Sequence, residues 1–215
     1  LSAVGAVRLL PGGGLDLATF SEVEVDDWFS GTLELRGRGA GRSPDVAVTS
    51  GQIDLRRFDA PPDAAGNGAN DAGAGQILIQ LDRLQVTDGI SLIGFQGNFT
   101  QRGGFNGAFT GSVNGEAAIE GTVVPSRHGR AVRFEARDAG AALRAAGVFS
   151  SARGGTMDMR LTPQPGKGQY DSRVEIRDLR VQKTNVLAEL LSAVSVVGLL
   201  EQLNGTGILF GTADF

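Results

Sequence analysis

Between residues 95 and 115 the chain alternates apolar residues or glycine with polar residues. Phe95, Phe99, Phe105, Phe109 and Val113 all occupy odd positions, whereas most even positions carry Gln, Asn, Thr, Arg or Ser. A period of two residues is typical of a β-strand with one face turned toward apolar surroundings. The stretch is far longer than an ordinary strand, so it must fold back on itself.

Parity also restricts the hairpins that this stretch can form. Loops of three or five residues keep odd positions opposite odd positions, whereas a two-residue loop would move the rings to the other face. We expect turns centred on Arg102 and Gly115. The facing pairs expected from these centres are Phe99 with Phe105, Phe95 with Phe109, and Phe109 with Gly121.

Most of the remaining sequence has the same alternation, broken at short intervals by Gly, Asn, Asp and Pro. Alternation of this kind predicts half-buried antiparallel strands. Further strands are expected at residues 32–37, 51–58, 77–86, 121–124, 131–136, 156–161 and 172–181. Residues 61–75 have the composition of a flexible loop. We expect one elongated domain over residues 1–215, cut from a longer chain because the sequence does not begin with Met.

Two segments have a helical pattern instead. Residues 138–147 predict a short helix, with Asp138 as the N-cap and Gly147 at the C′ position. Residues 184–205 predict a longer and almost wholly apolar helix, whose only charges are Glu189 and Glu201. It is just long enough to span a bilayer. The two acids and the absence of a basic flank argue against that, so we expect it to pack on the sheet or lie in an apolar groove.

The fold class expected is therefore mostly β with two helices. The sheet is expected to be elongated, twisted and antiparallel, and to curl into a U-shaped groove. The second helix would cap or plug that groove through its apolar side chains. The side chains expected to do so are Leu187, Leu190, Leu191, Val194 and Val197.

Composition excludes several classes of function. The net charge of −4 argues against nucleic acid as a partner, because phosphate binding needs a concentrated basic surface. The chain has no cysteine, which removes thiolate metal sites and Cys nucleophiles. Its single histidine, His128, lies in a polar turn without nearby ligands or catalytic partners. We expect no enzyme activity, no metal and no cofactor.

The face of alternating rings and glycines has two interpretations. It can be the filled core of a β-domain, which is the usual fate of buried apolar residues. Glycines fill no volume, however, and weaken strands, so the face can instead be a concave apolar surface that accepts an acyl chain. The residues expected to form a lipid-binding face are Phe95, Phe99, Phe105, Phe109, Val113, Ile119 and Val123.

The C-terminal third carries a resemblance. Asp138-Ala139-Gly140 precedes the short helix, Arg153-Gly154-Gly155 opens a strand, and Gly205-Thr206-Gly207-Ile208 follows the long helix. This order, over roughly residues 131–215, resembles the C-terminal region of AsmA-like proteins, particularly their YhdP-like branch. The N-terminal part is similar only in the style of its strands.

The resemblance implies a function that spacing alone does not give. Such proteins are anchored in the inner membrane of Gram-negative bacteria, project through the periplasm, and are implicated in carrying phospholipid to the outer membrane. Related TamB-like proteins assist outer-membrane protein assembly, so a partner-binding β-domain with a filled core is the alternative. Phospholipid, other segments of the parent chain and an edge-strand dimer are the partners expected. A carbohydrate-binding domain is disfavoured, because only Trp28 and Tyr170 offer the stacking rings it would need.

Overall fold

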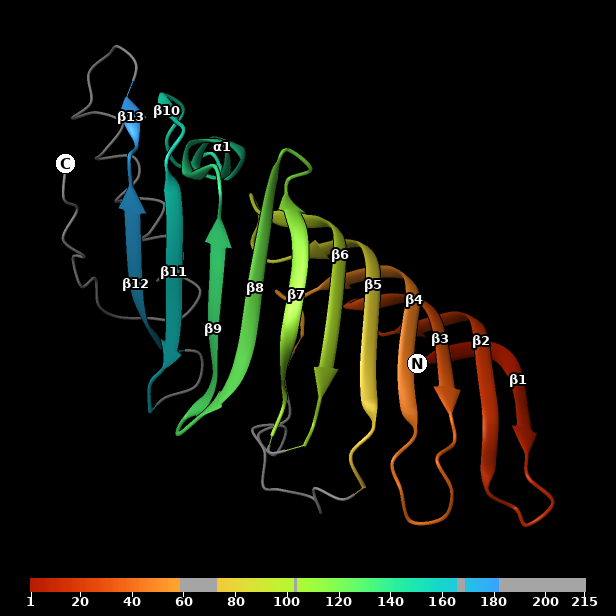
Figure 1. The fold of residues 1–215 in the computed structure, drawn as a ribbon. Coiled ribbons are helices and arrows are strands. Elements are labelled where there is room, and N and C mark those ends of the chain that lie inside the picture. The colour runs from red at the N-terminus through yellow and green to blue at the C-terminus, as the bar shows by residue number, and fades with distance from the viewer. Residues whose placement is uncertain (59–72, 103, 166–168, 182–215) are drawn as a thin grey trace.

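The computed structural model describes residues 1–58, 73–102, 104–165 and 169–181, and a single long, twisted and open β-sheet dominates it (Figure 1). A short helix and a two-stranded sheet lie at one end of the large sheet (Figure 1). The elements are β1 (Ser2–Leu9), β2 (Leu15–Val25), β3 (Phe29–Arg36), β4 (Asp45–Asp54), β5 (Gln76–Gln85), β6 (Ser91–Thr100), β7 (Asn106–Val113), β8 (Ala117–Ser126), β9 (Gly129–Ala136), α1 (Ala139–Ala145), β10 (Ala152–Arg153), β11 (Thr156–Pro163), β12 (Tyr170–Arg177) and β13 (Arg180–Val181).

The large sheet follows the order of the sequence. Its 11 strands run β1-β2-β3-β4-β5-β6-β7-β8-β9-β11-β12, and β10 pairs with β13 in the small sheet. Every neighbouring pair is antiparallel except β4 and β5, which are parallel. The expectation of a purely antiparallel sheet was therefore wrong at one place. After β4 the chain returns to the opposite end of the sheet before β5 begins, as a parallel pair requires.

The strands expected at 32–37, 77–86, 121–124, 131–136 and 156–161 are confirmed as parts of β3, β5, β8, β9 and β11. Two expected boundaries were wrong. The strand placed at 51–58 is β4, which ends at Asp54 and is followed by turns. The strand placed at 172–181 is broken at Asp178, whose φ of 56° is incompatible with an extended backbone, so β12 and β13 are separate. The sequence did not suggest β1 or β2.

The short helix predicted at 138–147 is α1, and both expected caps are confirmed. The Asp138 carboxylate accepts a hydrogen bond of 2.8 Å from the backbone N–H of Ala141. Gly147 has a φ of 70°, and the N–H of Val148 donates to the carbonyl of Leu143, which is the pattern of a Schellman motif. Among the described residues α1 is the only α-helix, and the longer helix predicted at 184–205 lies outside them. Most of the predicted loop at 61–75 lies outside them too.

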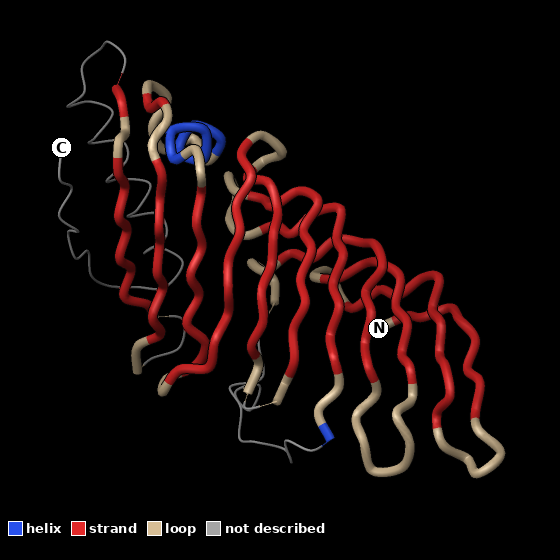
Figure 2. The backbone as a smooth tube through the Cα atoms, in the orientation of Figure 1, coloured by secondary structure: helices blue, strands red, loops and turns tan. Residues whose placement is uncertain are grey.

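Register shifts cross the N-terminal half of the sheet. They occur at Asp16 and Ser21 in β2, at Thr49 in β4 and beside Gly94 in β6. Such β-bulges bend a strand and increase its twist. In Figures 1 and 2 the strands from β1 to β6 bend over at their upper ends. The backbone N–H that the β4 bulge leaves free at Gly51 donates to the carboxylate of Asp82 in β5, at 3.2 Å.

Candidate functional site

Strand pairing places one continuous set of residues on a single face of the sheet, which we call the inner face. Across every neighbouring strand pair from β1 to β12, members of this set face other members. The members are Ala3, Gly5 and Val7; Ala18, Phe20, Val23 and Val25; Phe29, Gly31, Leu33 and Leu35; Val46, Val48, Gly51 and Ile53; Ile77, Ile79, Leu81 and Leu84; Leu92, Phe95, Gly97 and Phe99; Gly107, Phe109, Gly111 and Val113; Ala117, Ile119, Gly121 and Val123; Val132, Phe134 and Ala136; Met157, Met159 and Leu161; Val174 and Ile176.

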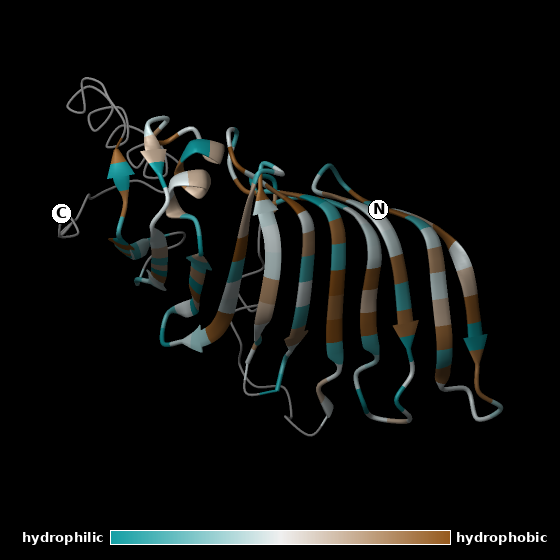
Figure 3. Ribbon diagram, turned by 45° about the horizontal axis from the view of Figure 1, so that its top comes forward, coloured by the Kyte–Doolittle hydropathy of each residue, from teal (hydrophilic) through white to brown (hydrophobic). Residues whose placement is uncertain are grey.

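Every member of the inner face is apolar or glycine. The set reaches polar residues only at its margins, where Ser172 faces Leu161 and Arg130 faces Pro125. The guanidinium carbon of Arg130 lies 4.7 Å from the centroid of the Phe105 ring, so this cation sits on an aromatic face at the margin. Figure 3 shows the alternation as brown bands that repeat along and across the strands. The inner face therefore offers no hydrogen-bonding side chain across its width.

In the centre of the inner face, over β6 to β8, phenylalanine rings occupy the space beside the glycines. A Cβ at Gly121 would stand 2.4 Å from Cζ of Phe109, and a Cβ at Gly97 would stand 2.2 Å from Cε2 of Phe99. Gly107 is covered in the same way, because a Cβ there would lie 2.6 Å from Cδ1 of Phe99. The glycines therefore accommodate the rings, and the hollows that the sequence suggested between the rings are filled.

The register of this region differs in part from the expected one. Phe109 faces Gly121 as predicted. Phe99 faces Gly107 rather than Phe105, because the β6–β7 turn is centred one residue later than Arg102. The rings still meet diagonally: Phe99 stacks on Phe105 with centroids 4.9 Å apart, and Phe95 stacks on Phe109 at 5.6 Å. Ring stacking across a glycine thus replaces the direct pairing expected.

All seven side chains predicted to bind lipid lie in one apolar cluster. Phe99 is only 4 % exposed and Phe95 only 7 %, so the rings pack on their neighbours rather than projecting from the sheet. Phe105 and Val123 are partly buried at the edge of the cluster. The five side chains predicted to cap the groove, at positions 187, 190, 191, 194 and 197, lie outside the described residues.

The inner face is more accessible on both sides of this ring-packed centre. Toward the N-terminus, Leu33, Val48 and Ile79 are half-buried, and toward the C-terminus Phe134 and Met159 are too. Sequence reasoning did not select these residues as site residues. Their signal was present as alternation in the segments that became β3, β5, β9 and β11, but nothing local distinguishes a half-exposed position from a buried one.

The opposite, outer face carries most of the polar residues, and several of its charges pair with each other. Glu120, Glu135, Asp158 and Glu175 face one another across β8, β9, β11 and β12. Arg133 bonds to Asp158, and this hydrogen bond holds the pKa of the Asp158 carboxyl below its usual value while raising that of Arg133. Arg160 reinforces the same carboxylate at 3.4 Å. The pair of Arg133 with Asp158 links β9 to β11 across the surface of the sheet.

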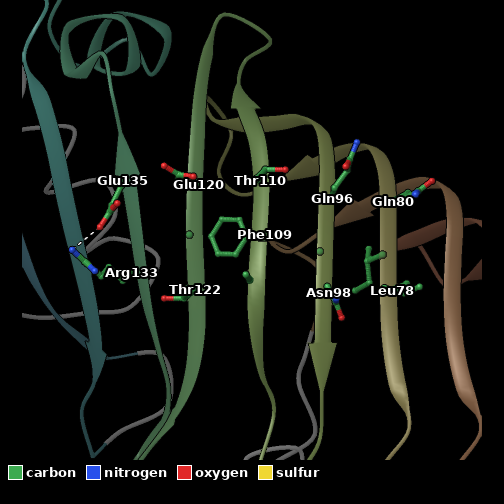
Figure 4. Close-up of a pocket in the computed structure, with 14 residues that line it drawn as sticks. Leu78, Gln80, Gln96, Asn98, Phe109, Thr110, Glu120, Thr122, Arg133 and Glu135 are labelled. Carbon is green, nitrogen blue, oxygen red and sulfur yellow. Dashed lines mark ion pairs between the residues drawn. The ribbon is translucent and has the colours of Figure 1, made fainter.

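A hollow of about 530 Å³ lies on this outer face (Figure 4). Its polar side chains belong to two rows of register partners, one through Gln80, Gln96, Thr110, Glu120 and Glu135, the other through Asn98, Thr122 and Arg133. In the part of the chain that is described, no group of His, Cys, Asp or Glu residues could hold a metal ion. Among the same residues, no helix has the length and apolar character needed to cross a membrane.

Comparison with protein-family models, with curated proteins and with solved structures finds no match to this chain.

Proposed function

We propose that this chain binds the acyl chains of phospholipid along its inner face, as a periplasmic segment of an AsmA-like envelope protein. The bent sheet would form a U-shaped groove around the acyl chains, and the parent protein would be anchored in the inner membrane. Lipid would then pass along the groove, from strand to strand, between the inner and outer membranes. The family assignment rests on the resemblance of residues 131–215.

The observation that carries this proposal is the composition of the inner face. Across 11 strands, its paired positions hold only apolar residues and glycine, and much of it remains half-buried. Hydrocarbon needs no hydrogen-bond donors or acceptors, and burying it on apolar side chains gains about 25 cal/mol per Å². A face this wide, with polar groups only at its margins, suits a flexible acyl chain better than a ligand with polar atoms along its length.

The burial pattern also indicates where the acyl chain would lie. The ring-packed centre has little surface left, because Phe95, Phe99 and Phe109 are each under 10 % exposed. The half-buried side chains of β3 to β5, such as Leu33, Val48 and Ile79, offer more contact area. We therefore propose that the principal acyl-chain contacts lie in β3 to β5, beside the packed phenylalanine rings.

The second candidate function is a structural or partner-binding β-domain that assists outer-membrane protein assembly. The packing of Phe109 on Gly121 favours this function locally, because the ring occupies the space beside the glycine that a ligand would otherwise fill. The two functions differ in one property. If the face is a filled core, the half-buried residues of β3 to β5 have no affinity for lipid. If it is a groove, these residues bind lipid.

Native mass spectrometry of the purified chain, incubated with phosphatidylglycerol and phosphatidylethanolamine, tests the proposal. Val48 and Ile79 face each other on the inner face, and Ala47 and Leu78 face each other on the outer face one position away. A Val48→Gln/Ile79→Gln variant is therefore matched by Ala47→Gln/Leu78→Gln as the control. We expect the inner-face variant to lose bound lipid by about tenfold and the control to retain it.

Loss of lipid to the same extent in both variants would contradict the proposal, as would a wild-type chain that binds no lipid. Circular dichroism and the urea midpoint of each variant establish that it remains folded. A folded wild type without lipid would favour the partner-binding β-domain.

A further inference from the structure

The turns at the lower ends of the strands in Figure 1, which we call the lower rim, carry an unusual charge distribution. Three of them lie between β3 and β4, between β6 and β7, and between β8 and β9. Their charged residues are Arg38, Arg42, Arg102 and Arg127, and none of the three turns contains Asp or Glu. A chain with a net charge of −4 thus gathers cations without acids along part of one rim.

Among the described residues, most of these cations have no ion-pair partner. Arg38 pairs with Asp45 at 3.5 Å. Arg42, Arg102 and Arg127 form no ion pair with any residue that the structure describes. The upper ends of the strands differ, because there Arg56 pairs with both Asp54 and Asp88.

A shallow hollow of about 480 Å³ opens among the lower ends of β4 to β7. Arg38 and Arg102 line it together with the amide side chains of Gln76, Asn98 and Asn106. Guanidinium groups are hydrogen-bond donors suited to phosphate oxygens, whereas Nδ2 of Asn106 already donates to the carbonyls of Arg102 and Gly104 and Nε2 of Gln76 donates to Asn98. Asp45 also lines the hollow but is paired with Arg38, so among the described residues of the hollow Arg102 has no ion-pair partner.

Apolar side chains accompany the cations. Val124 near the lower end of β8 is 48 % exposed. Phe105 lies in the β6–β7 turn region and carries the stacked Arg130. Arginines interspersed with exposed apolar side chains are typical of surfaces that lie against lipid headgroups.

We propose that the lower rim binds the surface of a bilayer that contains anionic phospholipid. The cations are spread over three turns on the same side of the sheet, so they match an extended layer of phosphates rather than one small anion (Figure 1). An anionic bilayer attracts such residues, whereas it repels a chain of negative net charge in other orientations. The inference rests on the rim alone and is independent of lipid binding on the inner face.

Co-sedimentation with vesicles tests this inference. The vesicles are phosphatidylcholine containing roughly a third phosphatidylglycerol, or phosphatidylcholine alone. The rim variant is Arg42→Gln/Arg102→Gln/Arg127→Gln. The matched control is Arg83→Gln/Arg173→Gln/Arg180→Gln, which removes the same charge from exposed positions on β5, β12 and β13.

We expect the wild type and the control variant to bind the anionic vesicles and to release them as salt increases. Each rim arginine should raise the affinity for the anionic vesicles about fivefold, so the rim variant, which lacks three, should bind them about a hundredfold more weakly. Equal binding to vesicles of phosphatidylcholine alone would overturn the inference. Equal weakening in the control would also overturn it, because net charge rather than the rim would then determine binding.

Discussion

Phe109 lies with its ring directly over Gly121, its facing residue on β8. A Cβ at position 121 would stand 2.4 Å from Cζ of Phe109 and 2.6 Å from the carbonyl oxygen of Arg133. We expect Gly121→Ala to lower the free energy of unfolding by about 1–3 kcal/mol, because ring and backbone would both have to move. Urea denaturation followed by circular dichroism measures this change.

Gly111 on β7 provides the matched control. A Cβ there would come no closer than 3.4 Å to its nearest neighbour, Cβ of Leu92. Gly111→Ala should therefore change the free energy of unfolding little, or raise it slightly, since glycine weakens a strand. An equal loss of stability in both variants would mean that the ring does not depend on the glycine beneath it.

This ring-on-glycine contact also marks the limit of what the sequence could predict. Alternation identified the strands and placed Phe95, Phe99 and Phe109 on one face, because the period of two residues depends on local geometry alone. It could not show that Phe99 covers Gly107 or that Phe109 covers Gly121, because these contacts join neighbouring strands. The missing side chain of a glycine was therefore interpreted as an unfilled hollow on the face of the sheet.

The strands missed or misplaced have a related cause. In β2, the bulge at Ser21 reverses which positions face inward, so Ala18 and Val23 share a face despite opposite parity. In β4, the bulge at Thr49 has the same effect on Val48 and Ile53. A strict alternation pattern cannot be followed through a bulge. The bulges, which bend the strands, are thus the feature least visible in the sequence.

Asn114 should be a major determinant of stability at the upper end of β7. Its side-chain oxygen accepts hydrogen bonds from the N–H and the hydroxyl of Ser91, at 2.8 and 3.0 Å. Its amide nitrogen donates to the carbonyls of Gly89 and Ala145, at 2.8 and 2.7 Å, which ties α1 to the sheet. We expect Asn114→Ala to lower the free energy of unfolding by about 2–4 kcal/mol.

The backbone of Asn114 requires its own control, because its φ of 47° is unfavourable for alanine. Asn114→Gly retains that conformation without the side-chain hydrogen bonds, and Asn114→Asp retains the acceptor but not the donors. If the hydrogen bonds matter, both variants should be less stable than the wild type in thermal denaturation. A fully stable Asn114→Gly variant would refute this role.

Removal of the N-cap should destabilise α1. Asp138→Ala deletes the acceptor of the Ala141 N–H, so we expect a loss of about 1 kcal/mol. Glu116→Ala removes an equal charge from the exposed β7–β8 turn and should have little effect. Native-state hydrogen exchange of the α1 amides distinguishes the two, since only the first variant should accelerate it.

Acid should destabilise the sheet through two carboxylates. Arg56 lowers the pKa of Asp54 by a side-chain hydrogen bond, and Arg133 does the same for Asp158. A carboxyl whose pKa is depressed in the folded state contributes stability above its unfolded value of about 3.9, and that stability is lost as pH falls through the folded pKa. Between about pH 6 and pH 3, the urea midpoint of the wild type should fall more than that of Asp54→Asn/Asp158→Asn. If the urea midpoints of the wild type and the variant fell equally with pH, the two carboxylates would not be the source of the acid sensitivity.

The most direct test of the proposed function locates the lipid on the protein. The protein is incubated with a phospholipid that carries a photoreactive group at the end of one acyl chain, and the complex is irradiated. Peptide mass spectrometry then identifies the crosslinked residues. The account predicts crosslinks on inner-face residues of β3 to β5, including Leu33, Val48 and Ile79, and competition by unlabelled phospholipid. Crosslinks confined to outer-face neighbours such as Glu34 and Gln80, or labelling that unlabelled lipid does not reduce, would contradict it.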